Sequence, residues 1–352
     1  MLSNKTSLNN PNPIISICIP TYNGERTIIN TLNELETQIN NSFEIIVSDD
    51  SSTDNTLNLV KNFQNKCQYL KVFNNEENIG MDRNFYKTTQ YAIGKYIWFC
   101  GQDDLLCNDI LKNVLDMVNK YPDIGILNLN FSQYDHNMEL CLTTSFFDDY
   151  SYQEKNVKNP NEIFFDSPND YFKYFTQPPS FLPSVVMLKS YWLDTDVKQF
   201  YGTFFIQVGV LLLNMHKNNI GVITTPHIKG RVPDDQWQAD GNKLFSILTG
   251  DLVAKSIAFK ANKSLPDNII KRDKLRYLAN YFFLLYNSKK TGFIPNQNNK
   301  KQLKLVFSDK LLYNLYLAPL LCCNLRILSI MHFPLFLVKR LLLSFRTFSR
   351  LR

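Results

Sequence analysis

Acidic side chains follow two predicted strands of this 352-residue chain, at the points where the strands end. The pair at 49–50 follows the strand at 43–47, and Asp103 and Asp104 follow the strand at 96–100. Carboxylates in such turns bind Mg²⁺ or Mn²⁺ together with phosphate oxygens of a ligand. They also cap the helix that comes next. The local sequence leaves both interpretations open.

The elements that position these turns alternate between strands and helices. Apolar, β-rich runs predict strands at 14–19, 43–47, 69–73, 96–100 and 124–131, and segments with apolar residues at helical spacing separate them. This order is typical of an α/β fold, in which a mostly parallel sheet is flanked by helices. Ligands of open α/β sheets bind at the edge where the strands end. We therefore expect the two acidic turns to lie on one functional edge.

The second half of the chain is less regular. Residues 135–168 predict long loops or a hairpin over this edge. Strands are expected at 185–188 and 220–225, with a helix at 204–217 between them. The stretch at 244–286 has a helical pattern.

Composition is that of a globular protein, with 44% hydrophobic and 20% charged residues. The seven cysteines form no C-x-x-C pair and have no histidine at zinc-site spacing, which favours reduced thiols in a cytosolic setting. The first 13 residues lack an apolar segment behind a basic start, so we expect no secretory signal.

The net charge of +6 is concentrated near the C-terminus, where Lys and Arg residues follow the last acid, Asp309. This placement predicts an anionic membrane surface, and no nucleic acid, as a partner. Residues 335–346 have the pattern of a basic amphipathic helix that lies in a membrane interface. A helical subdomain packed on the rest of the protein is the alternative.

Four short patterns occur in a fixed order in the first part of the chain, and together they are far more specific than each alone. They are Ser16-Ile17-Cys18-Ile19-Pro20-Thr21-Tyr22-Asn23, Ser48-Asp49-Asp50-Ser51-Ser52-Thr53-Asp54, Asn78-Ile79-Gly80 with Arg83-Asn84, and Gln102-Asp103-Asp104. This run resembles family 2 glycosyltransferases, whose catalytic domain has the GT-A (nucleotide-diphospho-sugar transferase) fold. The resemblance is clear from 14 to 121.

The resemblance implies roles for residues in all four patterns. Tyr22 would pack on the nucleotide base, and Asp50 would accept a hydrogen bond from the base or its ribose. Asp103 would contact the ribose, and Asp104 would hold the divalent metal, Mg²⁺ or Mn²⁺, at the donor diphosphate. The other expected contacts to the nucleotide sugar are Pro20, Thr21, Asn78, Gly80, Arg83 and Gln102.

Two residues near a later strand end complete the expected site. His227 is a candidate metal ligand and Arg231 a candidate charge clamp on the diphosphate. A surface loop is the alternative for both.

Two positions depart from the family pattern. Gln102 replaces the first acid of the common D-x-D form, and Gln207 stands where inverting members carry a carboxylate as general base. Glutamine cannot take up a proton, so the base comes from elsewhere or the reaction is not a simple inversion. The candidates are Asp194, Asp196, Asp234 and Asp235, and we place Asp234 and Asp235 with Asp104 as the catalytic residues.

The departures are similar to the abequosyltransferase-like branch of the family, which transfers 3,6-dideoxyhexoses from CDP-sugars during O-antigen assembly. The resemblance implies a metal-dependent glycosyltransferase of the hexosyltransferase type that serves lipopolysaccharide biosynthesis. Its acceptor would be a polyprenyl-diphosphate-linked saccharide, and it would lie peripherally on the cytoplasmic face of a bacterial inner membrane. A non-catalytic sugar- or membrane-binding relative is the alternative. A sugar-phosphate nucleotidyltransferase is disfavoured because the stretch at 19–24 lacks a Gly-rich, Arg-containing phosphate loop.

The resemblance also implies a division of the chain. We expect a flexible N-terminus at 1–13, a catalytic domain at 14–240 with its nucleotide-binding half at 14–131, and a helical C-terminal region at 241–352.

Overall fold

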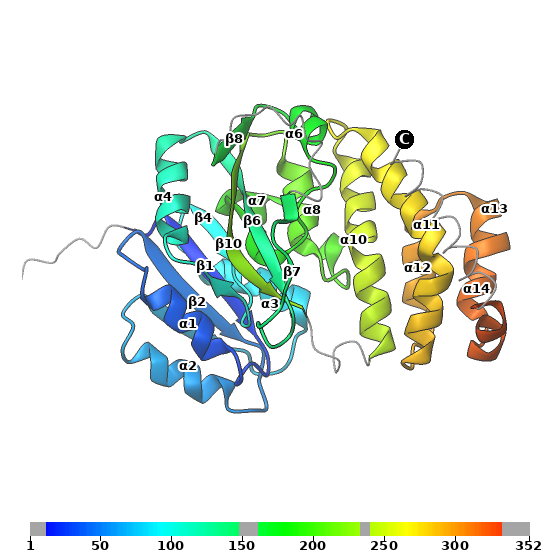
Figure 1. Ribbon diagram of the computed structural model, residues 1–352, viewed down its shortest axis with the longest axis horizontal. Coiled ribbons are helices and arrows are strands. Elements are labelled where there is room, and N and C mark those ends of the chain that lie inside the picture. The colour runs from blue at the N-terminus through cyan, green and yellow to red at the C-terminus, as the bar shows by residue number, and fades with distance from the viewer. Residues whose placement is uncertain (1–11, 148–160, 233–239, 333–352) are drawn as a thin grey trace, which may run out of the picture.

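The computed structural model describes residues 12–147, 161–232 and 240–332 (Figure 1). Its ten described strands form one mixed sheet, and four parallel strands make up the first half of this sheet. In spatial order these are β3 (Leu70–Asn74), β2 (Phe43–Asp49), β1 (Ile15–Thr21) and β4 (Tyr96–Phe99).

The second half of the sheet is mixed. It continues from β4 through β9 (Val185–Leu188), β6 (Ile124–Tyr134), β10 (Asn219–Arg231) and β5 (Leu105–Leu106). Strand β9 is antiparallel to both of its neighbours, whereas β6 and β10 are parallel to each other. The short strands β7 (Cys141–Thr143) and β8 (Glu162–Phe165) pair with β6 and β10.

Helices cover both faces of the sheet because its inner strands are buried on both sides. Ile15, Ile17 and Ile19 of β1 belong to one hydrophobic core, and Cys18 belongs to the other, as alternation along a strand requires. The first core includes side chains of α1 (Ile28–Glu36), α2 (Thr56–Gln64) and α4 (Ile110–Lys120). The second includes side chains of α3 (Met81–Tyr91), α6 (Pro168–Tyr174), α7 (Lys189–Asp194), the 3₁₀ turn η2 (Val197–Phe200) and α8 (Ile206–Asn214).

The later helices line up beside this second face, on the right in Figure 1. They are α10 (Gly241–Ala261), α11 (Asp267–Lys290), α12 (Gln297–Val306), α13 (Lys310–Leu312), the π-helical turn η3 (Tyr313–Leu317) and α14 (Ala318–Cys322). Gly250 of α10 lies against the backbone of the loop before α8, since an added Cβ would meet the Thr203 carbonyl oxygen at 1.8 Å. The helices therefore share one core with the sheet, and the expected boundary at residue 240 stays a prediction.

The predicted α/β fold with a mostly parallel sheet is confirmed, and several strands run past their predicted ends, β10 the furthest. The pattern predicted 220–225, but β10 runs on to Arg231 after an irregularity between Ile223 and Ile228. Pro226 lies inside this irregularity, where its missing N–H interrupts the ladder. The extension carries Arg231 to the acidic turn after β4.

The described helices include no single one that is long and apolar enough to cross a membrane. One pair, Lys310–Cys322 and Leu325–His332, reaches that length and composition when taken together, with a bend of 107°. The predicted amphipathic helix at 335–346 lies outside the described residues.

Candidate active site

The ends of β1 and β4 are joined by the side chain of Gln102. Its Oε1 accepts hydrogen bonds from the Thr21 hydroxyl and from the Tyr22 N–H at 3.0 Å, and its Nε2 donates to the Tyr22 carbonyl at 3.2 Å. A carboxylate at this position would only accept. The departure from the D-x-D pattern therefore lets one amide hold both backbone groups of Tyr22.

Tyr22 itself is the exposed member of this group. Its side chain is 44% exposed, whereas Thr21 beside it is buried. An exposed ring on a fixed backbone at the end of β1 suits stacking on a planar base. Pro20 precedes them in β1, where it is paired in register with Ser48 of β2.

The Asp50 carboxylate organises the loop between β3 and α3. Its Oδ1 accepts from Asn75 Nδ2 at 2.8 Å and from the Ile79 N–H at 2.9 Å, and its Oδ2 accepts from the Gly80 N–H at 2.9 Å. Gly80 has φ +86°, a conformation that favours glycine, and Asn78 Oδ1 also accepts from its N–H at 3.1 Å. Asp50 is buried, so in this structure it positions the loop rather than facing open solvent.

Arg83 lies on the first turns of α3, just after this loop. Its side chain is exposed, and its guanidinium lies over the Tyr201 ring at 5.7 Å from the centroid. The long side chain of Arg83 thus places a positive charge beside the loop that Asp50 positions.

The acidic turn after β4 holds one buried carboxylate, Asp104, and one half-buried carboxylate, Asp103. Asp104 is 4% exposed, and burial together with the nearby Asp103 raises its pKa well above the usual range. Burial also raises the pKa of Asp103, although the Arg231 guanidinium opposes this. A Cβ on Gly101 would lie 2.2 Å from Asp104 Oδ2, so the carboxylate packs directly on the glycine backbone.

Arg231 closes this turn from β10. Its backbone N–H donates to Asp104 Oδ1 at 3.2 Å, and its Nε donates to the Asp103 carbonyl at 3.1 Å. Its Nη1 also donates to the His136 carbonyl. The turn therefore brings together two carboxylates and one guanidinium. Two crowded carboxylates with a single counter-charge fit a divalent cation that takes its other ligands from phosphate and water.

His227, which was predicted to bind the metal together with Asp104, contacts helix α4 instead. Its Nε2 lies 3.2 Å from Asn113 Nδ2 of α4, and burial lowers its pKa. Across the described ranges, no group of three or more His, Cys, Asp or Glu side chains could hold a metal ion. The structure thus does not gather His227 with Asp103 and Asp104, and its ligand role stays a prediction without geometric support.

The general base is not identified by the described residues. Gln207, at the start of α8, is buried, donates from Nε2 to the Ser180 carbonyl at 2.9 Å, and leaves Oε1 without a partner. Asp196 caps a 3₁₀ turn by accepting from the Lys198 N–H at 3.3 Å, and Asp194 ends α7. Asp234 and Asp235 lie outside the described residues.

One buried acid was not expected from the sequence. Asp82 Oδ2 accepts from the Gly202 N–H at 2.7 Å and from the Phe204 N–H at 3.1 Å, while Oδ1 has no partner. Burial raises the pKa of Asp82 to about 6. An acid in the first turn of a helix ordinarily just complements the helix dipole, so the sequence carries no signal for this contact.

The sheet order, with the Gly80 loop and the acidic turn at its strand ends, is that of a GT-A fold. Residues 16–173 match the family model for Glycosyl transferase family 2. A mannosyltransferase from Pyrobaculum calidifontis, solved with GDP-Man and Mn²⁺, has a similar fold, with a TM-score of 0.51 and 15% identity over 87% of this chain and 83% of that one.

Two curated relatives are similar over about a third of the chain. The abequosyltransferase RfbV of Salmonella typhimurium is 35% identical over 114 residues, which cover 32% of this chain and 34% of the relative. The GalNAc(5)-diNAcBac-PP-undecaprenol β-1,3-glucosyltransferase of Campylobacter jejuni is 29% identical over 109 residues, 31% of this chain and 35% of the relative. The chain thus spans about a third of the length of each.

Proposed function

We propose that this chain is a glycosyltransferase that moves a sugar from a nucleotide-diphosphate donor with the help of Mg²⁺ or Mn²⁺. The observation that carries the proposal is the turn formed by Asp103 and the buried Asp104, which Arg231 closes from β10. It lies at the end of β4, at the sheet edge where Asp50 positions the Gly80 loop. The match of residues 16–173 to the family model supports the same chemistry.

Each part of this edge has a separate task in that reaction. Tyr22 stacks on the base, and Gly80, which has no side chain, lets the backbone of its loop approach the donor closely. Asp104, with Asp103, holds the metal, which when bound neutralises charge on the departing diphosphate. Arg231 adds a fixed positive charge beside the same turn, where it stabilises the leaving group without moving a proton.

The donor that we propose is a CDP-linked 3,6-dideoxyhexose, and the acceptor a polyprenyl-diphosphate-linked saccharide of O-antigen synthesis. The similarity to an abequosyltransferase supports the donor. The similarity to an enzyme named for a PP-undecaprenol acceptor supports the acceptor. Both similarities cover only about a third of the chain, so the experiment below tests several donors.

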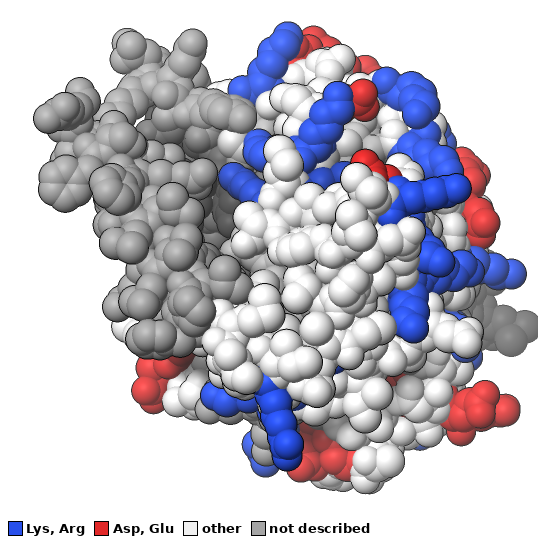
Figure 2. All heavy atoms as spheres, turned by 90° about the vertical axis from the view of Figure 1, so that its right-hand side faces the viewer, with Lys and Arg blue, Asp and Glu red and all other residues white. Residues whose placement is uncertain are grey.

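A protein surface that binds a membrane would suit this acceptor, because the acceptor is lipid-linked. Residues 310–332 contain no acid, and they expose several large apolar side chains: Leu311, Leu315, Tyr316, Leu325, Ile327, Ile330 and Met331. The same side of the molecule is uncharged over its centre, with Lys and Arg side chains grouped above and along one side (Figure 2). An apolar surface with a basic border matches an anionic bilayer. We place the protein peripherally on the cytoplasmic face of an inner membrane, where lipid-linked acceptors would be within reach.

The test is to incubate the protein with CDP-, UDP-, GDP- and dTDP-sugars, with and without Mn²⁺, and to follow nucleotide release and transfer. We expect one nucleotide class to be strongly preferred and release to depend on the metal. Asp104→Ala should lose this activity, with Asp116→Ala on the exposed side of α4 as the matched control. Metal-independent release, or full activity in Asp104→Ala, would contradict the proposal.

A non-catalytic sugar-binding role is the second candidate, and Gln207 favours it, because this position offers no base. That role requires nucleotide-sugar binding without turnover. It also requires Asp104→Asn to support surface-polysaccharide synthesis in cells as well as the unaltered protein does.

A further inference from the structure

The entry loop, residues 201–205, leads into α8 and is bonded to the first turn of α3. Asp82 Oδ2 accepts from the backbone N–H of Gly202 at 2.7 Å and from that of Phe204 at 3.1 Å. Both loop residues have positive φ, which is unfavourable for Phe204 because it has a side chain. Such a backbone conformation persists only where neighbouring groups hold it. The buried Asp82 carboxylate supplies two of the hydrogen bonds that hold the entry loop.

The same turn of α3 is also bonded to the donor side of the sheet edge. It begins after Gly80, whose N–H donates to Asp50 Oδ2 at 2.9 Å. The turn is closed by the Asn84 N–H, which donates to the Gly80 carbonyl at 3.0 Å. One closed helical turn thus contacts the Asp50 carboxylate at its start and the entry loop through Asp82. A shift of the entry loop relative to the Gly80 loop would have to break one of these bonds.

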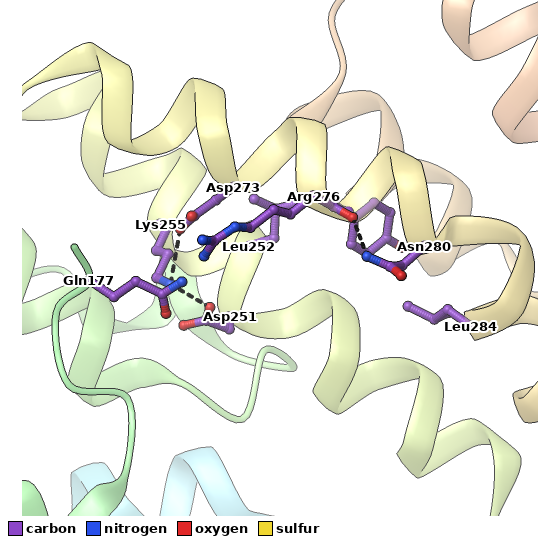
Figure 3. Close-up of a pocket in the computed structure, with 9 residues that line it drawn as sticks. Gln177, Asp251, Leu252, Lys255, Asp273, Arg276, Asn280 and Leu284 are labelled. Atoms are coloured by element: carbon purple, nitrogen blue, oxygen red, sulfur yellow. Dashed lines mark hydrogen bonds and ion pairs between the residues drawn. The ribbon is translucent and has the colours of Figure 1, made fainter. Parts of the chain in front are cut away.

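The other side of the entry loop is supported by the later helices. The backbone of α10 at Gly250 packs directly on the Thr203 carbonyl, and Gln302 of α12 donates to another carbonyl of the loop at 3.3 Å. Helix α10 is joined to α11 by a buried ion pair, in which Lys255 Nζ lies 3.2 Å from Asp273 Oδ2 (Figure 3). Asp82 therefore bonds α3 to a loop that has a fixed support behind it.

The entry loop also restricts the position of Arg83. The Arg83 guanidinium lies over the Tyr201 ring, 5.7 Å from the centroid, which is within the range of a cation–π contact. The Arg83 side chain is long and exposed, so a ring beneath it limits the conformations that it takes. Arg83 is one of the expected contacts to the nucleotide sugar. A displaced Tyr201 ring would therefore displace a charge that serves the donor.

We propose that Asp82 is a positioning residue of the proposed reaction, which sets where Arg83 meets the donor diphosphate by holding the entry loop and its Tyr201 ring. The words donor and reaction rest on the proposed function, while the link between the entry loop and the Gly80 loop rests on the contacts alone. Asp82 itself touches neither the donor nor the metal in this proposal.

Two variants at Asp82 test the link by amide hydrogen exchange of the full chain. Asp82→Ala removes the acceptor of both N–H groups, so exchange at Gly202 and Phe204 should rise roughly 10-fold or more. Asp82→Asn keeps an oxygen that can accept the same two bonds and should restore slow exchange. Asp309→Ala is the matched control, because Asp309 also accepts from two backbone N–H groups, at the start of α13. Unchanged exchange in Asp82→Ala would overturn the proposal.

Exchange with bound nucleotide distinguishes positioning from a contribution to stability alone. The probes are CDP, UDP, GDP and dTDP, each with Mn²⁺. The nucleotide that binds should slow exchange in both the Gly80 loop and the entry loop. In Asp82→Ala it should slow exchange in the Gly80 loop alone. An entry loop that does not respond to the bound nucleotide in the unaltered protein would overturn the proposal.

Hydrolysis of the donor that the nucleotide-sugar panel selects tests whether Asp82 acts through Arg83. Asp82→Ala should lower kcat roughly 10- to 100-fold, as a small misplacement of a reacting group does, and should leave the KM of the donor nearly unchanged. In the Arg83→Ala background the same change should cost almost nothing more, because the charge that Asp82 positions is already absent. Independent, additive losses in the double variant would overturn the proposal.

A second variant keeps this test valid if Asp82→Ala does not fold. Tyr201→Leu removes the ring beneath Arg83 and leaves both hydrogen bonds of Asp82 in place. It should lower kcat as Asp82→Ala does, without raising exchange at Gly202. Full kcat in Tyr201→Leu would contradict the route through this ring.

Nucleotide binding and release on the same samples separate the two proposals. A protein that binds and releases nucleotide with Mn²⁺, but in which the two loops respond independently, keeps the proposed function and loses the role of Asp82. A protein that binds none of the four nucleotides loses the proposed function. The link between the loops is then retained only if Asp82→Ala speeds exchange in both of them.

Discussion

The carboxylate of Asp82 on α3 accepts a hydrogen bond of 2.7 Å from the backbone N–H of Gly202, in the loop that leads into α8. Gly202 and Phe204 of this loop both have positive φ, at +81° and +64°. Such backbone conformations persist only where surrounding contacts hold them. Asp82 therefore links the helix after the Gly80 loop to the loop before Gln207.

The burial of Asp82 predicts that the free energy of unfolding depends on pH, because burial raises the pKa of this carboxyl. The pKa of Asp82 is raised from 3.8 to about 6, so between these values the folded protein binds a proton that the unfolded chain has released. The free energy of unfolding therefore falls as pH rises through this window, by about 3 kcal/mol, and levels off above it. Asp82→Asn removes this contribution. Urea unfolding of both proteins at pH 4.5 and 7.5 measures it, and an equal pH response in the two would contradict the prediction.

A substitution at Gly101 is expected to weaken metal binding at the proposed site. Gly101→Ala puts a methyl group 2.2 Å from the present position of Asp104 Oδ2, so the carboxylate must move. We expect Mn²⁺ affinity in the presence of nucleotide to fall by roughly 10- to 100-fold, as when a supporting group of a metal ligand is changed. Titration calorimetry measures this, and metal-free nucleotide binding serves as the control. Unaltered Mn²⁺ affinity would show that Asp104 is not the ligand.

A substitution of the buried Asp50 is expected to weaken nucleotide binding. In Asp50→Asn the amide nitrogen must face either the Ile79 N–H or the Gly80 N–H, and one of these donors loses its acceptor. The expected cost is about 1–3 kcal/mol, which corresponds to roughly 10-fold or more in nucleotide affinity if the loop shifts. Glu77→Gln, an exposed acid in the same loop, is the control. Equal loss in both variants would point to charge rather than to loop position.

A glutamate in place of Gln207 is not expected to act as the general base. In Gln207→Glu a buried carboxylate would replace the amide that donates to the Ser180 carbonyl, so an acceptor would face an acceptor. We expect a lower melting temperature, from a cost of about 1–3 kcal/mol or more, and no gain in transfer rate. A clear rise in rate would show that the position faces the acceptor after all.

The apolar side chains at 311–331 predict membrane binding. Leu315→Glu and Ile330→Glu each replace an apolar group that is more than 70% exposed and that a bilayer would bury. Each change should weaken binding to vesicles with anionic lipid by roughly tenfold, from the ~1.5–3 kcal/mol of a buried Leu or Ile. Vesicle sedimentation measures this. Ile93→Glu, at an exposed position in the turn after α3, should bind as the unaltered protein does.

The sequence by itself determined the alternation of strands and helices and the order of the four donor-side patterns. These are local properties, since the period of apolar residues and the turn residues at strand ends lie within short windows. The GT-A fold, which the resemblance of these patterns to a known family implied, is confirmed, and Tyr22, Asp50, Asp103 and Asp104 lie where the strands end. The general base does not follow from these patterns, because the candidates Asp234 and Asp235 lie in a segment outside the described residues.

Tertiary structure alone decided which distant residues meet. Arg231 reaches the Asp103-Asp104 turn only because β10 continues past the irregularity at Pro226, and His227 is turned toward Asn113 by the same strand. Asp82 meets Gly202 across 120 residues, a contact that no local pattern encodes. The pairing of Lys255 with Asp273 likewise depends on how α10 packs on α11. Burial and hydrogen bonding between separate elements decide such contacts, because they depend on how the whole chain packs.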